Sequence, residues 1–133
     1  MTGFPGETDA RFRRMLADLA EMDFDRLGAF AFSPEEGTAA AKLKGRPARR
    51  VAEAREREVM AAQKKRWAAK ARRFKGKTFK ALVVAPGVAR LACQAPDVDG
   101  VTRLTGGKSA EVGRFADVTI TRVRGFDFEG VVR

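Results

Sequence analysis

The chain has 133 residues, 44% of them hydrophobic, and a net charge of +10, so it has length and apolar content for one ordinary domain or a small domain with part of another. One cysteine excludes an internal disulfide, and the absence of histidine removes the commonest general base and metal ligand near neutral pH. Because histidine is absent and cysteine occurs once, we expect no catalytic, cofactor-binding or metal-binding residues in the chain itself. No apolar leader or long apolar run occurs, so we expect a cytoplasmic protein that does not enter a membrane.

The first segment, residues 1–46, is predicted to form one helix and one strand. A helix over Asp9–Met22, capped by Thr8 or Asp9, follows from apolar residues that share one helical stripe, namely Phe12, Met15, Leu16 and Leu19. The apolar run Leu27–Phe32 predicts a strand, because Pro34 then directs the chain into an extended loop. One strand cannot form a sheet, so this α/β unit needs partners outside the chain.

The second segment, residues 47–75, is predicted to be a long basic helix. Pro47 suits a first helical turn, and strong helix formers then continue without Gly or Pro. The apolar residues of its C-terminal half share one face, namely Met60, Trp67, Ala71 and Phe74. Val51 lies roughly opposite that face, so the N-terminal half is expected to project into solvent.

The third segment, residues 76–133, alternates with period two after Gly76 and contains turn signals between short apolar runs. Five strands are expected, centred on Phe79–Val84, Val88–Leu91, Val101–Leu104, Phe115–Ile120 and Phe126–Val131. A closed OB-like barrel is favoured, because closure removes the exposed edges of a small sheet. Cys93 is expected to be a small buried residue in a strand of this segment.

The positive charge is concentrated in the middle of the chain. Residues 1–39 carry four basic and eight acidic side chains, residues 40–90 carry seventeen and three, and residues 91–133 carry six of each. Such a block attracts polyanions in a salt-dependent way, unless it is only a solvated helix face. We predict a nucleic-acid or partner-binding site where the helix meets the barrel, formed by Arg72, Arg73, Lys75, Lys77 and Lys80. Phe74 and Phe79 lie between these residues, with core packing as their expected role.

Two other motifs offer weaker readings. The string GFPGET at residues 3–8 precedes a helix but lacks the lysine and hydroxyl residue of a phosphate-binding loop, so a strand-to-helix turn is favoured. Glu35 and Glu36 are adjacent carboxylates without a nearby nucleophile or histidine, so a turn is favoured over acid–base chemistry.

Three motifs carry a family resemblance. The strings GFPGET at residues 3–8, FSPEEGT at 32–38 and QAPDVDG at 94–100 resemble the C-terminal part of the radical-SAM methylthiotransferases of the RimO type, which thiomethylate a ribosomal protein. The chain departs from the family's pattern at Met1-Thr2, where two aliphatic residues are usual, and after Thr38, where a proline is common. The third motif favours this branch over the MiaB-like tRNA-modifying branch.

The resemblance implies an α+β architecture. Residues 1–46 would be the truncated α/β tail of a radical-SAM barrel, residues 47–75 a basic linker helix, and residues 76–133 a five-stranded TRAM-type barrel. In the family this barrel recognises tRNA or the ribosomal protein target. The implied partners are therefore a small-subunit ribosomal protein, RNA, or both, together with an N-terminal catalytic half.

The resemblance also implies iron–sulfur clusters and S-adenosylmethionine for the full-length enzymes. A radical-SAM cluster needs the three thiolates of a CxxxCxxC motif, and this chain has only Cys93, so it is expected to be inactive by itself. Three hypotheses stay open: the substrate-binding part of an enzyme, a free-standing TRAM-type RNA-binding module, and a non-functional product that aggregates through an exposed face of Phe12, Leu16 and Leu19.

Overall fold

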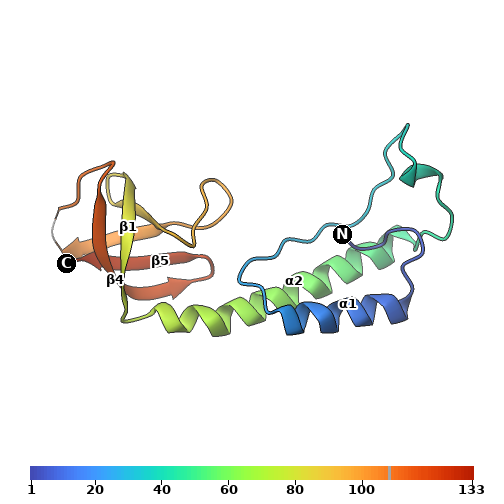
Figure 1. The fold of residues 1–133 in the computed structure, drawn as a ribbon, viewed down its shortest axis with the longest axis horizontal. Helices are drawn as coiled ribbons and strands as arrows, with labels where there is room; N and C mark the ends of the chain where they lie inside the picture. The colour runs from blue at the N-terminus through green and yellow to red at the C-terminus, as the bar shows by residue number, and fades with distance from the viewer. Residues whose placement is uncertain (108) are drawn as a thin grey trace. The chain divides into compact units, whose positions relative to one another are not determined.

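A computed structural model describes residues 1–107 and 109–133. The chain divides into two compact units, Met1–Trp67 and Ala68–Arg133, and each is considered by itself. Its elements in order are α1 (Asp9–Met22), the short 3-10 helix η1 (Ala40–Lys42), α2 (Arg49–Ala71), the 3-10 helix η2 (Arg72–Phe74) and five strands (Figure 1). The strands are β1 (Thr78–Ala85), β2 (Val88–Leu91), β3 (Thr102–Gly107), β4 (Phe115–Arg124) and β5 (Asp127–Val132).

In the first unit, α1 and α2 lie side by side (Figure 1). The cap of α1 is as predicted: the Thr8 Oγ1 atom accepts a hydrogen bond from the Arg11 backbone N–H at 3.3 Å. Phe12 is buried rather than exposed, because the guanidinium of Arg55 lies over its ring, with 5.2 Å between the guanidinium carbon and the ring centroid.

The prediction that the N-terminal half of α2 projects into solvent is wrong. Its buried positions repeat at helical spacing and form one continuous face: Ala52, Arg55, Val59, Gln63 and Trp67. Two of these side chains are polar and have their partners inside the unit. Arg55 pairs with Glu7 and Asp9, and the Gln63 side-chain amide donates to the backbone carbonyls of residues 24 and 25. A search for apolar residues alone therefore misses part of the buried face of α2, because Arg55 and Gln63 belong to it.

The strand expected at Leu27–Phe32 is also absent from the described residues. Thr2 and Ala31 form only an isolated parallel bridge, in which the Thr2 N–H donates to the Phe30 carbonyl and the Phe32 N–H donates to the Thr2 carbonyl. A ladder needs a neighbour of matching length, and here the neighbour is the short segment around Thr2. Gly3 follows that bridge directly. A side chain has no room at this position, because a Cβ there would lie 2.2 Å from the Ala52 Cβ of α2.

The second unit is a closed five-stranded barrel, as predicted, with neighbours in the order β1-β2-β3-β5-β4 (Figure 1). All pairs are antiparallel except β3 with β5. Its interior is filled by alternate residues of the strands, chiefly Ala81, Val83, Ala89, Leu91, Thr102, Val118, Ile120, Phe128 and Val132. Closure gives each of the five described strands a neighbour on both sides.

The structure corrects two details of the barrel prediction. The apolar pattern assigned to β1 mixed both faces: Ala81 and Val83 are buried, whereas Val84 is exposed. The expected burial of Cys93 is wrong, because β2 ends at Leu91 and Cys93 lies in the exposed turn that follows.

Candidate nucleic-acid and protein interface

The predicted basic residues lie in one continuous segment that passes from η2 into β1. Two hydrogen bonds fix this segment on β4: the Gly76 N–H donates to the Ile120 carbonyl at 2.8 Å, and the Ile120 N–H donates to the Lys77 carbonyl at 2.9 Å. The side chains that form the segment's charge are all exposed, namely Arg72, Arg73, Lys75, Lys77 and Lys80. We call these five residues the basic segment.

The five charges are engaged to different degrees. Among the described residues, Arg72, Lys75 and Lys77 make no ion pair, so their positive charge is not offset locally. The Lys80 Nζ atom lies 3.7 Å from an Asp117 carboxylate oxygen, and the Arg73 guanidinium lies 5.6 Å from the centroid of the Phe74 ring. A surface pair such as Lys80–Asp117 is weak in water, so an incoming anion can replace its carboxylate.

The two phenylalanines within the basic segment form part of the barrel core. The Phe74 ring stacks on buried Phe128 with 5.1 Å between centroids, and it packs against Phe79 at 5.3 Å. This geometry agrees with the expected core role, and it leaves the base-stacking role without support from Phe74 or Phe79.

A different aromatic residue is exposed on the outer surface of the barrel. Phe115, the first residue of β4, retains 70% of its accessible surface. The register places it opposite Leu82 of β1, and Leu82 lies opposite Arg90 of β2, so these three residues form one row across the sheet. Sequence reasoning placed Phe115 among strand residues but did not determine which face of the sheet it occupies.

The adjoining rows on this face are polar. Lys80 lies opposite Asp117, and Thr78 lies opposite Thr119, with 2.8 Å between the two threonine hydroxyls. The Arg133 Nε atom donates to the Thr119 hydroxyl at 2.7 Å. We call Phe115, Leu82 and Arg90, together with these polar rows, the outer face of β1 and β4. Lys77 lies one residue before Thr78, so the outer face continues into the basic segment.

The loop between β2 and β3, residues 92–101, contains the motif QAPDVDG and is fixed by buried hydrogen bonds. The Gln94 Oε1 atom accepts from the Leu91 N–H and the Thr102 hydroxyl, and its Nε2 atom donates to the Phe126 carbonyl. A carboxylate oxygen of Asp99 accepts the Ala95 N–H at 3.0 Å. The backbone of this loop is thereby held by its own polar side chains.

The tip of the same loop is presented to solvent. Val98 retains 85% of its accessible surface, and Asp97 is exposed beside it in the left-handed conformation, with φ of 59°. At the base of the loop, a Cβ on Gly100 would lie 2.4 Å from the backbone of Phe126, so this close approach requires glycine. The motif therefore consists of a structural base and an exposed tip with an apolar and an acidic side chain.

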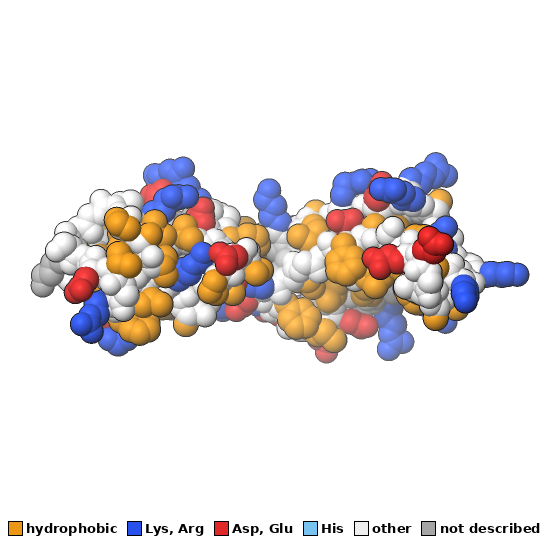
Figure 2. All heavy atoms as spheres, turned by 90° about the horizontal axis from the view of Figure 1, so that it is seen from above, with side chains coloured by type: hydrophobic (Ala, Val, Ile, Leu, Met, Phe, Trp, Pro, Cys, Tyr) orange, Lys and Arg blue, Asp and Glu red, His pale blue; other side chains and the backbone are white. Residues whose placement is uncertain are grey.

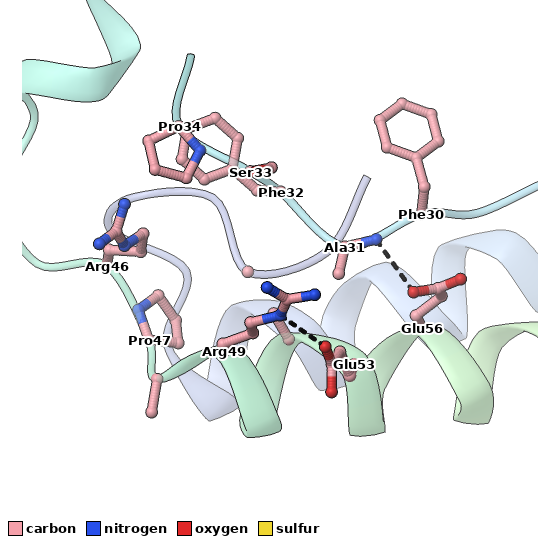
Figure 3. A pocket seen from close by; sticks show the side chains of 13 residues that line it. Phe30, Ala31, Phe32, Ser33, Pro34, Arg46, Pro47, Arg49, Glu53 and Glu56 are labelled. Atoms are coloured by element: carbon pink, nitrogen blue, oxygen red, sulfur yellow. Dashed lines mark hydrogen bonds and ion pairs between the residues drawn. The ribbon is translucent and has the colours of Figure 1, made fainter. Parts of the chain in front are cut away.

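The first unit contains a pocket of about 520 Å³ beside the Thr2–Ala31 bridge (Figure 3). Its carboxylates are occupied: Glu53 pairs with Arg49 at 2.7 Å, and Glu56 accepts the Ala31 N–H at 3.1 Å. The pair with Glu53 raises the pKa of Arg49 above its usual value. Phe30 points away from α2 in Figure 3. Both carboxylates of this pocket are therefore engaged in binding other parts of the unit, which does not favour acid–base chemistry.

The motifs at residues 3–8 and 35–36 are turns, as the favoured interpretations predict. In the first, the Gly3 N–H donates to the Glu7 carboxylate, the Gly6 N–H to the Gly45 carbonyl and the Glu7 N–H to the Phe4 carbonyl. These donors are satisfied by the chain itself and do not form a phosphate cradle. In the second, the Glu35 carbonyl accepts the Thr38 hydroxyl and N–H, and both carboxylates are exposed.

Residues 1–107 and 109–133 contain no cluster of three or more His, Cys, Asp or Glu side chains that could hold a metal ion. Within the same ranges, none of the helices combines the length and the hydrophobicity needed to cross a bilayer. The donor set of the chain also does not fit a radical-SAM cluster, because Cys93 is its single cysteine and lies in an exposed turn.

Comparison with known proteins agrees with this architecture. Residues 76–132 match the model of the TRAM domain family, and they comprise the barrel together with the Gly76-Lys77 entry to it. The match confirms the TRAM-type barrel predicted from the sequence.

Nearly the whole chain is similar to curated enzymes named ribosomal protein uS12 methylthiotransferase RimO. The relative from Opitutus terrae is 42% identical over 127 residues, which cover 96% of this chain and 26% of the relative. The relative from Thermodesulfovibrio yellowstonii is 38% identical over 136 residues, which cover 99% of this chain and 32% of the relative. The predicted resemblance is thus confirmed, and the chain spans about a quarter to a third of the length of these relatives.

Proposed function

Because residues 76–132 are a TRAM domain and nearly the whole chain is similar to RimO-type methylthiotransferases, we propose that it is the substrate-binding portion of such an enzyme. In this proposal residues 1–46 are the end of the radical-SAM domain, residues 47–75 connect it to the barrel, and residues 76–133 hold the substrate. The substrate is a small-subunit ribosomal protein, for which uS12 is the first candidate because the relatives are named for it.

The proposed portion is not catalytic by itself. Three thiolates are needed to hold a radical-SAM cluster, and Cys93 supplies one at most. The clusters and S-adenosylmethionine would be held by a catalytic half supplied by other residues, and this chain would contribute binding and orientation of the target. Such positioning is a large component of catalysis, because it converts an encounter into a reaction of fixed geometry.

The exposed tip of residues 97–98 is the observation that supports binding of a protein. Ribosomal proteins are commonly basic and are repelled by the basic segment, whereas Asp97 has the complementary charge and Val98 offers an apolar contact. The buried hydrogen bonds at the base of the loop hold its backbone before binding, which reduces the conformational entropy lost when the target docks.

This proposal is tested by calorimetric titration of the full chain with uS12 at low and high salt. Asp97→Asn removes the charge yet tolerates the left-handed backbone, and Val98→Ser removes the apolar contact at an exposed site. We expect each variant to weaken binding about three- to tenfold while the thermal unfolding midpoint stays unchanged. Val112→Ser, at another exposed turn of the barrel unit, is the matched control. Equal affinity for all four proteins would contradict the role given to the loop.

RNA binding is the second candidate function, and the basic segment is the observation that favours it. Arg72, Lys75 and Lys77 present charges without an ion pair among the described residues, on a backbone fixed to β4. We expect the full chain to bind single-stranded RNA with an affinity that falls as salt rises. Replacing Lys75 and Lys77 by Gln should lower the salt slope by about 1.4, since each phosphate contact on a single strand contributes about 0.7. A salt slope that both substitutions leave unchanged would exclude the basic segment as the RNA site.

A further inference from the structure

The outer face of β1 and β4 combines an exposed aromatic ring with nearby cations and hydroxyls. Phe115 is 70% exposed, although a phenylalanine of this size is ordinarily placed in the core. On the face of the barrel unit visible in Figure 2, hydrophobic side chains lie among both basic and acidic side chains. Packing of the barrel does not explain a ring at position 115, because the interior is already filled from the opposite face of the described strands.

We propose that this outer face binds single-stranded RNA, with one base stacked on Phe115 and the neighbouring phosphates at Lys80 and Arg133. The inference deepens the RNA-binding function proposed above and rests on it. The basic segment supplies long-range attraction, and the outer face supplies the contact that distinguishes an unpaired base from a duplex.

The platform is rigid on both sides of the ring. The Val83 N–H donates to the Arg114 carbonyl at 2.9 Å, and the Gly113 N–H donates to the Val83 carbonyl at 2.8 Å, so the backbone that leads into Phe115 is held against β1. Leu82 lies directly opposite Phe115 in the ladder, so the pairing of β4 with β1 begins at the residue that carries the ring. A ring on a fixed backbone loses little entropy when a base stacks on it.

The charges around the ring favour a polyanion over a protein. The cations nearest to Phe115 in the register and in sequence are Lys80, Arg90, Arg114 and Arg133. Two carboxylates, Asp117 and Glu111, lie near the same hollow of about 360 Å³ at the start of β4. Cations therefore exceed acids here, and Lys77 and Lys75 lie a few residues before Lys80 in the same chain segment. Electrostatic complementarity of this kind suits phosphate groups and not a basic protein.

Lys80 and Arg133, the two residues proposed to bind phosphates, are not fully engaged by their present partners. Among residues 1–107 and 109–133, Lys80 makes one ion pair, an exposed one with Asp117 at 3.7 Å, which is long for a charge-assisted hydrogen bond. Arg133 donates from Nε to the Thr119 hydroxyl, which leaves its terminal nitrogens to face a phosphate. Asp117 is the carboxylate that pairs with Lys80, so its neutralisation should favour RNA binding.

The test uses the full chain and a fluorescein-labelled decauridine in anisotropy titrations at low and high salt. Phe115→Leu keeps an apolar side chain but removes the ring, and it should weaken binding about tenfold without changing the salt slope. Phe115→Trp should bind at least as tightly as the unmodified chain, and Asp117→Asn a few-fold more tightly. Phe30→Leu, at a residue 62% exposed in the first unit, is the matched control and should have no effect.

Circular dichroism melts show whether each variant is folded. If Phe115→Leu does not fold, the RNA affinity of Phe115→Trp relative to the unmodified chain tests the ring instead. Equal RNA affinity for Phe115→Leu and the unmodified chain, with the effect of Lys75 and Lys77 retained, would overturn the platform while RNA binding by the basic segment stands. No RNA binding by the unmodified chain would overturn both proposals. Loss of uS12 affinity in Phe115→Leu, with RNA affinity intact, would assign this face to the protein instead.

Discussion

Replacing Arg55 by Leu should unfold most of the first unit, because this residue neutralises a buried carboxylate. The Arg55 side chain is 8% exposed and pairs with Glu7, which is 12% exposed, at 2.7 Å, and also with Asp9, which is 85% exposed. Burial alone lowers the pKa of Arg55, but its hydrogen bonds to Asp9 and Glu7 outweigh burial and raise that pKa above the usual value. Arg55 therefore remains charged in the fold.

The expected magnitude follows from the partner that is left behind. Removing one member of a buried ion pair costs about 3–5 kcal/mol, since the other charge stays desolvated. A unit of this length has a free energy of unfolding of about 3–10 kcal/mol, so the loss approaches the whole stability of the unit. With a urea m-value of about 1–1.5 kcal/mol/M, the unfolding midpoint should fall by about 2 M or more.

The assay is urea unfolding followed by the fluorescence of Trp67. It is the single tryptophan of the chain and is 3% exposed, with the Arg26 guanidinium 3.7 Å from its ring centroid, so its emission reports the first unit. Asp9→Asn is the matched control and should cost about 1 kcal/mol at most, because the Asp9 carboxylate is solvated. The double variant Glu7→Gln with Arg55→Leu should recover part of the loss. The reasoning fails if Arg55→Leu leaves the midpoint unchanged, or if Asp9→Asn costs as much.

Three further substitutions test the packing of the two units. Gly3→Ala should destabilise the first unit by about 1–3 kcal/mol in the Trp67 assay, because its Cβ would lie 2.2 Å from the Ala52 Cβ at a φ of 75°; an unchanged urea midpoint would contradict this close approach. Gln94→Leu should cost the barrel about 2–4 kcal/mol in thermal unfolding by circular dichroism, since it removes three hydrogen bonds that the Gln94 side chain makes; a loss below about 0.5 kcal/mol would show that the loop holds itself in another way. Cys93→Ser should change the thermal unfolding midpoint very little, because the residue is exposed, and a large decrease would restore the burial expected from the sequence.

Local patterns were sufficient to predict the elements of the barrel. Residues 116–120 alternate strictly between apolar and polar side chains, and turn signals separate this run from its neighbours, so the strand follows from its own residues. Which face each residue occupies depends on register across strands, and register is not a local property. The sequence therefore predicted β4 correctly but not the exposure of Phe115. A local signal was present, because Phe115 lies an odd number of positions from Val118 and Ile120 and so faces the opposite side of the strand.

The first unit was harder to predict because its buried surface is partly polar. Arg55 and Gln63 occupy core positions of α2, and a search for apolar stripes omits both. The spacing from Ala52 to Trp67 is helical only when these two residues are counted. The same limitation affected the extended segment around Ala31, because its pairing depends on Thr2, which is distant in sequence. The basic segment, by contrast, was predictable because exposed charges on a continuous stretch of chain need no knowledge of packing.

The barrel unit carries two surfaces of opposite electrostatic character, and the two proposals use them separately. The loop tip has Asp97 beside an apolar residue, whereas the basic segment and the outer face have an excess of cations. A small-subunit ribosomal protein within its particle is surrounded by RNA, so a module that recognises such a protein gains from contacts of both kinds.

Salt separates the two contributions, because phosphate contacts weaken steeply as salt rises while a partly apolar contact does not. If both proposals hold, Asp97→Asn and Lys77→Gln should act independently on binding to a uS12–RNA complex, with additive free-energy changes, because they belong to the loop tip and to the entry of β1 and form no ion pair with each other in the part of the chain that the structure describes. A strong energetic coupling between the two substitutions would mean that one partner covers both surfaces. The proposal that the loop tip binds protein while the basic segment binds RNA would then be wrong.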